Sequence, residues 1–170
     1  MKIIGYKYFW YDGVNWIEQP KNDVDIELRL KGLSWQNKKK RTLLMNIKVP
    51  IVNKNVDLCL FDGDFTSFNK STDSQHRDLS KYLALGELKG GIDPAGADEH
   101  WKTANSALIR IRAAFEKLKL SPKTFFVASA IEKSMAEEIY NQLINKNLSF
   151  ASNLTNETQL VNLCNWIVKL

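Results

Sequence analysis

Glu87 and Lys89 are the residues of this sequence whose types and spacing most directly suggest chemistry. They stand two positions apart in the segment Gly-Glu-Leu-Lys-Gly-Gly, so on a β-strand both side chains would leave the same face. Asp57 lies in a second strand-like segment, Val-Asp-Leu-Cys-Leu-Phe, where an uncompensated buried carboxylate would be costly. Asp57 and Glu87 would repel each other if brought together, unless a divalent cation lay between them. Because Mg²⁺ prefers such oxygen ligands, these residues predict a magnesium site beside which Lys89 can hold a water or stabilise a phosphate.

The upstream carboxylate of this predicted site has three candidates. Asp57 occupies a strand position, and we prefer it to Asp62 and Asp64, which follow in Phe-Asp-Gly-Asp-Phe. An acid followed at a distance by Glu-x-Lys is the signature of the PD-(D/E)xK nucleases, but Glu-x-Lys also occurs in many strands as a plain surface ion pair. The three residues alone therefore leave both interpretations open.

A longer run favours the nuclease interpretation. The segment from Gly86 to Arg112, GELKGGIDPAGADEHWKTANSALIRIR, closely resembles the catalytic segment of type II restriction endonucleases of the AvaI/BsoBI-like family. The resemblance implies an α/β fold with a PD-(D/E)xK restriction-endonuclease-like core, in which a mixed β-sheet is flanked by helices. It also implies a Mg²⁺-dependent, sequence-specific endonuclease that hydrolyses phosphodiester bonds of double-stranded DNA and leaves 5′-phosphate ends.

The same resemblance assigns roles to four residues. Glu87 corresponds to the metal-ligating glutamate, and Lys89 corresponds to the catalytic lysine. His100 resembles a histidine that acts as a general base or positions the attacking water, and Asp93 resembles an acid of the active-site loop. Two of these residues have plainer interpretations, because His100 can be an ordinary residue of a helix start and Asp93 can shape a turn before Pro94.

Basic and aromatic residues offer further contacts to DNA. Lys102, Arg110 and Arg112 are expected to contact phosphate, although charged residues on a helix are often simply solvated. The run Lys38–Arg41 is equally compatible with a phosphate-binding patch and with a solvated hairpin turn. Three tryptophans can stack on bases, but packing within hairpins is their commoner role: Trp10, Trp16 and Trp35.

The expected partner is double-stranded DNA, cut by a homodimer, because two antiparallel strands need two active sites related by a two-fold axis. A cognate DNA methyltransferase would belong to the same system without binding the nuclease. The chain is shorter than full-length members of the family, so a reduced recognition apparatus is expected. The alternatives are a truncated or degenerate domain that binds DNA or a partner without cleavage, and a nuclease of the same fold that acts in repair or on RNA.

Composition fits a cytoplasmic protein of this kind. The chain has 170 residues, a formal net charge of +5 and a pI of about 9.1, which favours a polyanionic partner. No apolar run is long enough to span a bilayer, and the N-terminus does not resemble a secretory leader. Cys59 and Cys164 lie within apolar patterns and are expected to be reduced core residues.

Periodicity predicts the elements that position these residues. Alternating and apolar segments predict a hairpin around Asp12-Gly13 over 7–17 and strands over 24–30, 43–51, 56–61, 82–89 and 124–131. A polar loop is expected over 62–79. Helical spacing predicts helices over 97–118, 134–144 and 158–168, the second opened by a Ser134/Glu137 capping box.

These elements predict a single nuclease-like domain over residues 1–170. Within it we expect a β-rich N-terminal part over 1–52, a catalytic core over 53–131 and C-terminal helices over 132–170. The strand–helix–strand unit over 82–131 is expected to be parallel.

Overall fold

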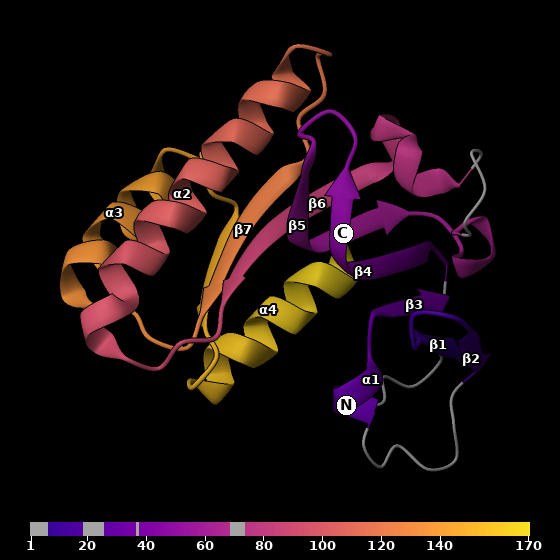
Figure 1. Ribbon diagram of the computed structural model, residues 1–170, viewed down its shortest axis with the longest axis horizontal. Coiled ribbons are helices and arrows are strands. Elements are labelled where there is room, and N and C mark those ends of the chain that lie inside the picture. The colour runs from indigo at the N-terminus through magenta and orange to yellow at the C-terminus, as the bar shows by residue number, and fades with distance from the viewer. Residues whose placement is uncertain (1–6, 19–25, 37, 69–73) are drawn as a thin grey trace. The chain divides into compact units, whose positions relative to one another are not determined.

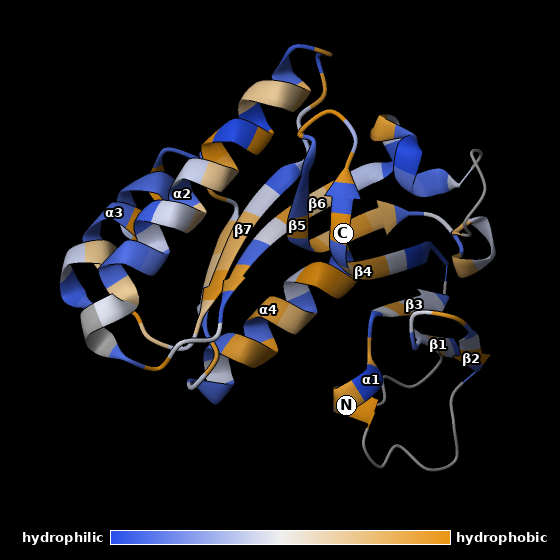
Figure 2. Cartoon of the chain, in the orientation of Figure 1, coloured by the Kyte–Doolittle hydropathy of each residue, from blue (hydrophilic) through white to orange (hydrophobic). Residues whose placement is uncertain are grey.

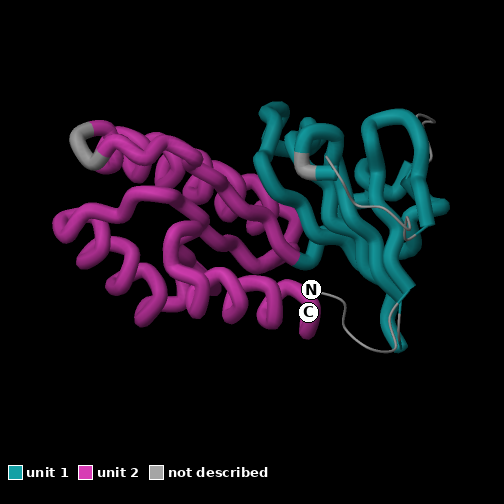
Figure 3. Tube along the Cα trace, turned by 90° about the horizontal axis from the view of Figure 1, so that it is seen from below, with its two compact units in different colours: residues 1–83 teal, residues 84–170 magenta. Residues whose placement is uncertain are grey.

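The computed structural model describes residues 7–18, 26–36, 38–68 and 74–170 (Figure 1). The chain divides into two compact units, Met1–Leu83 and Ala84–Leu170, which Figure 3 distinguishes by colour. The division falls within strand β6, Tyr82–Lys89. Strand pairs are antiparallel in the first unit and parallel in the second.

The first unit is built from antiparallel strands in the order β2-β1-β3-β4-β5. Its strands are β1 (Lys7–Tyr11), β2 (Trp16–Glu18), β3 (Gly32–Gln36), β4 (Lys40–Val49) and β5 (Lys54–Asp62). Its helices are short: α1 (Ile26–Arg29) and the 3₁₀ turns η1 (Phe65–Ser67), η2 (Gln75–Arg77) and η3 (Leu79–Lys81).

The first hairpin shows why these residues turn where they do. The Asp12 carboxylate accepts hydrogen bonds from the backbone N–H groups of Val14 and Asn15, each at 2.7 Å. Gly13 has φ of 101°, a conformation that side chains with a Cβ rarely adopt. The ring of Trp16 then stacks on the cross-strand ring of Tyr11 at 4.9 Å, which locks the register.

The second unit alternates strands and helices. After β6 come α2 (Pro94–Glu116), β7 (Lys123–Ala128), α3 (Lys133–Ile144), β8 (Phe150–Asn153) and α4 (Glu157–Lys169). β6, β7 and β8 are neighbours in that order and run parallel, as expected for a strand–helix–strand unit.

Helices cover both faces of this parallel sheet. Successive residues of β7 point to opposite faces, and Phe126 packs edge-on against Trp101 of α2 at 5.0 Å. Its neighbour Phe125 packs against Trp166 of α4 at 5.4 Å. Hydrophobic and hydrophilic residues alternate along α2 in Figure 2, as expected for a helix with one buried face.

The α/β class with strands of mixed direction and flanking helices is confirmed, but several details differ from the prediction. The segment 24–30 is not a strand where the structure describes it, because Ile26–Arg29 forms helix α1; residues 24–25 lie outside the described part. Leu28 is 75% exposed, so the apolar alternation that suggested a strand does not mark a buried face. Strands β3 and β8 were not predicted, and the expected loop over 62–79 contains the three 3₁₀ turns.

Two predictions about single residues were also wrong. Helix α3 has Glu132 at its N-cap with no side-chain cap hydrogen bond, so Ser134 lies inside the helix and forms no capping box. Both cysteines are free, as expected, but only Cys59 is buried. Cys164 is exposed, because α4 buries the neighbouring stripe of Leu163 and Ile167 instead.

In the part of the chain that the structure describes, none of the helices is both long enough and apolar enough to cross a bilayer.

Candidate active site

A glycine in β6 leaves room for an aromatic ring of the neighbouring strand β7. Gly86 lies opposite Phe125 in the parallel register, and a Cβ at position 86 would approach the Phe125 Cζ to 2.3 Å. Only glycine allows this approach without moving the ring. The contact sets the level of the next residue, Glu87, which lies opposite Phe126.

Glu87 and Lys89 lie on the same face of β6, as their spacing predicts. The Lys89 Nζ is 3.3 Å from the Glu87 Oε2. The Glu87 side chain is 8% exposed and that of Lys89 is 22% exposed, so both charges are largely removed from water. Burying a carboxylate and an ammonium group is costly even when they are paired, and such pairs are therefore weak evidence for stability. A catalytic role for the pair stays a prediction.

The face that carries this pair is covered by α2. Residues opposite each other in a parallel register point to the same side, and Phe126, opposite Glu87, contacts Trp101 of α2. Trp101 is fully buried, and its indole N–H donates a hydrogen bond of 2.5 Å to the Glu138 carboxylate of α3. This hydrogen bond between α2 and α3 was not predicted, because nothing in the local sequence indicates that two residues so far apart in the chain are in contact.

His100 is brought to the same end of the sheet. A Cβ on Gly91 would lie 2.5 Å from the His100 Cε1, so the imidazole ring lies directly against the turn that follows Lys89. Gly96 is also near, with its Cβ position 3.7 Å from the same carbon. The absence of a side chain at Gly91 thus leaves room for the histidine. His100 therefore belongs to the neighbourhood of the Glu87–Lys89 pair rather than to a remote part of the helix.

Asp93 lies in the same turn and is exposed. Its backbone carbonyl accepts a hydrogen bond of 3.2 Å from the Gly96 N–H at the start of α2. This contact is what a turn-shaping residue makes, and the predicted role of the Asp93 side chain on DNA stays a prediction.

The three predicted phosphate contacts on α2 lie in different surroundings. Lys102 is exposed and pairs with Asp98 at 2.6 Å and Glu99 at 3.1 Å. The hydrogen bond to Asp98, and to a smaller extent the one to Glu99, raises the pKa of the Lys102 ammonium group. Arg110 is exposed, whereas Arg112 is half-buried and donates a hydrogen bond to Thr124 at the start of β7. Arg112 is twelve positions beyond His100, roughly 18 Å along the helix, so it lies away from the Glu87–Lys89 pair.

The three candidate upstream acids belong to the first unit. Asp62 pairs with the buried Arg41, and Asp64 pairs with Lys40 at 2.8 Å. Asp57 is half-buried and shares its face of β5 with Cys59, which is fully buried. Asp62 and Asp64 are each engaged by a cation of their own unit, and the preference for Asp57 stays a prediction.

Asp64 also accepts hydrogen bonds from the Gln36 side chain at 2.7 Å and the Thr66 N–H at 3.1 Å. Burial raises the pKa of its carboxyl, but the hydrogen bonds from Lys40 and Thr66 outweigh burial and hold the pKa below its ordinary value. Asp64 therefore acts as a structural acid that caps η1.

The remaining predicted DNA contacts of the first unit are divided between surface and core. Lys38 and Lys39 are exposed in the β3–β4 turn, whereas Arg41 is buried, and a phosphate-binding role of this run stays a prediction. Trp10 and Trp35 are 6% and 5% exposed, which favours packing over base stacking for both.

The family model described as Restriction endonuclease BsobI matches residues 1–170. The chain belongs to this restriction endonuclease family. It is 55% identical over 166 residues to Type II restriction enzyme AvaI from Nostoc sp. and to the protein of the same name from Anabaena variabilis. It is 49% identical over 176 residues to Type II restriction enzyme BsoBI from Geobacillus stearothermophilus.

These alignments cover 97% of the chain and 52% of AvaI, and 100% of the chain and 54% of BsoBI. The chain thus spans about half the length of the curated relatives it matches. The family resemblance predicted from the run Gly86–Arg112 is confirmed, and it extends over the whole chain rather than over the catalytic segment alone.

The donor set suits the divalent cation that type II restriction endonucleases generally use. Glu87 presents a buried carboxylate at the end of β6. Within the described residues no group of three or more His, Cys, Asp or Glu side chains forms a cage for a metal. A cation bound by one or two carboxylates, with water and phosphate oxygens completing its shell, is the pattern preferred by Mg²⁺.

Proposed function

We propose that this chain carries the catalytic machinery of a sequence-specific type II restriction endonuclease, which hydrolyses double-stranded DNA. The observation that carries the proposal is the buried Glu87–Lys89 pair at 3.3 Å, with His100 packed against the following turn, in a chain of this family. A surface ion pair would not need two largely buried charges. The nearby histidine supplies the group that a hydrolysis reaction requires for proton transfer.

In the proposed reaction, water attacks the scissile phosphorus and the bond from phosphorus to the 3′-oxygen breaks. The Lys89 Nζ donates hydrogen bonds to the attacking water or to a phosphate oxygen, where negative charge develops. A ring nitrogen of His100 accepts the proton that the water loses. The 3′-oxygen takes up a proton from solvent water and His100 returns its proton to solvent, so the products are a 5′-phosphate and a 3′-hydroxyl.

Glu87 would be a ligand of the Mg²⁺, which when bound polarises the phosphate and neutralises its charge. Lys89 orients the Glu87 carboxylate through their hydrogen bond. Asp93, Lys102 and Arg110 would contact DNA outside the reacting phosphate. We further propose a homodimer, because one active site serves one strand and a two-fold axis places a second site on the other strand.

The test is cleavage of supercoiled plasmid DNA in Mg²⁺ by wild type, Glu87→Gln and Lys89→Gln. Glu137→Gln and Lys133→Gln are matched controls, because both residues are exposed on α3. Discrete fragments that disappear with Glu87→Gln and Lys89→Gln but persist in the controls support the proposal. Calorimetric titration with Mg²⁺ should show weaker binding for Glu87→Gln than for Glu137→Gln.

Other outcomes overturn the proposal in favour of a stated alternative. DNA binding without cutting by the folded wild type indicates a degenerate binding domain. Smearing without fixed fragments indicates a same-fold repair nuclease, and preferential RNA cleavage indicates a ribonuclease. Full activity of Glu87→Gln would remove the proposed site.

A further inference from the structure

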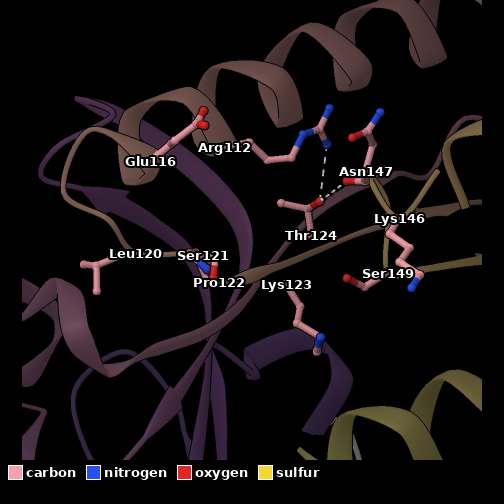
Figure 4. Close-up of a pocket in the computed structure, with 10 residues that line it drawn as sticks. All are labelled: Arg112, Glu116, Leu120, Ser121, Pro122, Lys123, Thr124, Lys146, Asn147 and Ser149. Carbon is pink, nitrogen blue, oxygen red and sulfur yellow. Dashed lines mark hydrogen bonds between the residues drawn. The ribbon is translucent and has the colours of Figure 1, made fainter.

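A second polar pocket lies in unit Ala84–Leu170, away from the Glu87–Lys89 pair. It is a cavity of about 410 Å³ where β7 begins, bordered by the end of α2 and by the segment between α3 and β8 (Figure 4). In the parallel register Lys123 lies opposite Ala84, whereas Ala128 lies opposite Lys89. The pocket is thus at the opposite end of β7 from the candidate active site.

Positive charge dominates the lining of this pocket. Arg112, Lys123 and Lys146 supply three cations, and Glu116 supplies the single carboxylate. None of the three cations makes an ion pair within the part of the chain that the structure describes. The hydroxyl groups of Ser121 and Ser149 add hydrogen-bond donors to the same lining. The pocket is therefore matched to an anion with several acceptor oxygens.

Arg112 is held in place before any ligand arrives. Its Nη1 donates to the Thr124 Oγ1 at 3.3 Å, and that hydroxyl donates to the backbone carbonyl of Asn147 at 2.9 Å. Thr124 is 2% exposed, so this relay is anchored in the core, and Figure 4 shows the guanidinium group extending from α2 toward it. A pre-positioned cation loses less conformational entropy when it binds.

Burial also lowers the pKa of the Arg112 guanidinium, which nevertheless stays protonated at neutral pH. A half-buried cation with no carboxylate partner among the described residues gains more from a bound anion than a fully hydrated one does. Guanidinium groups bind phosphate oxygens in a bidentate manner, and Lys ammonium groups bind phosphate as point charges.

We propose that this pocket, lined by the cations Arg112, Lys123 and Lys146, binds a phosphate group. Its volume exceeds that of a bare phosphate and is within the range of small-ligand sites, so the attached sugar or base is accommodated as well. The phosphate belongs either to the DNA backbone outside the cleavage site or to a free nucleotide. Binding of a phosphate of the DNA backbone rests on the proposed function, whereas binding of a free nucleotide does not.

The first arm of the test uses ¹⁵N–¹H spectra of the full chain titrated with inorganic phosphate and with a deoxynucleoside monophosphate. Saturable shifts of the Thr124 and Ser149 amides are expected for wild type and are expected to be lost in Arg112→Gln. Glu116→Gln removes the one carboxylate and should tighten binding. Lys117→Gln is the matched control, because Lys117 is exposed and lies outside the lining.

The second arm measures binding of duplex DNA by anisotropy in EDTA, so that it does not depend on cleavage. A lost phosphate contact should weaken binding by about tenfold in Arg112→Gln and lower the slope of log K against log salt by about 0.9. An effect in this arm identifies the DNA backbone as the source. An effect in the first arm alone identifies a free phosphate ester.

Circular dichroism and thermal melting confirm that each variant is folded. The proposal is overturned if neither arm responds to folded Arg112→Gln and Lys146→Gln, or if Lys117→Gln has the same effect as they have. Neither arm measures cleavage. A chain that binds phosphate or DNA but does not cut DNA would therefore overturn the proposed function, while the phosphate-binding role of this pocket would still stand.

Discussion

Replacing Gly86 by alanine tests the close packing that positions Glu87. The new Cβ would lie 2.3 to 2.7 Å from three ring carbons of Phe125, whereas ordinary contacts begin at 3.4 Å. The ring is fully buried and packs against Trp166, so it cannot move away without opening the core. Overpacking of this kind costs about 2–3 kcal/mol. For a chain of this length that corresponds to a fall in Tm of about 4–12 °C.

The assay is urea unfolding followed by circular dichroism, with Gly90→Ala as the matched control. No heavy atom lies within 4 Å of a Cβ at position 90, so that variant should unfold at nearly the wild-type urea concentration. Adding Phe125→Leu to Gly86→Ala removes the clashing ring atoms and should cost less than the sum of the two single changes. A free energy of unfolding for Gly86→Ala within 0.5 kcal/mol (about the range of surface changes) of wild type would refute the reasoning.

Three further outcomes are expected from other parts of the chain. The pKa of Asp64 is held below its ordinary 3.8, so the stability that this carboxylate contributes is present above pH 3.8 and lost as the pH falls through the lower folded value. Asp64→Asn should therefore be less stable than wild type at pH 7 and converge with it in acid, and parallel pH–stability curves would contradict this. Gly13→Ala, at φ of 101°, should lower the free energy of unfolding by about 1 kcal/mol in urea titrations; an unchanged midpoint would count against the left-handed turn. A thiol reagent should modify exposed Cys164 at once and buried Cys59 only after unfolding, and equal rates in the native protein would disprove that difference.

Much of the candidate site could be predicted because its signals are local. Glu87 and Lys89 share a face as a consequence of the two-residue period of a strand, and the strand extends over the residues that the pattern indicates. The apolar stripe from Trp101 to Leu118 was recognised from helical spacing. It is buried as far as Phe115, whereas Leu118 lies beyond the end of α2 and is 50% exposed. The Asp12-Gly13 turn likewise depends on neighbours within three residues.

Other features depend on partners that are distant in the sequence. β3 and β8 have few of the residues that favour strands, and they form because β1, β4 and β7 offer their hydrogen-bonding edges. The identity of Phe125 as the neighbour of Gly86 likewise depends on the parallel register. Cys164 and Leu163 differ in exposure because packing selects one face of α4, which its own pattern does not define sharply.

The sequence by itself determined the family, the α/β class and the pair of charges on one strand. Each of these depends on short-range residue spacing or on a continuous motif. Only the tertiary structure decided that His100 lies against the glycine turn, that Asp62 and Asp64 are engaged by cations, and that Arg112 lines a separate pocket. The physical reason is that burial and pairing are set by contacts between segments brought together by the sheet. The residue pattern of one segment shows which of its side chains can be buried. The packed structure determines which residues each of those side chains contacts.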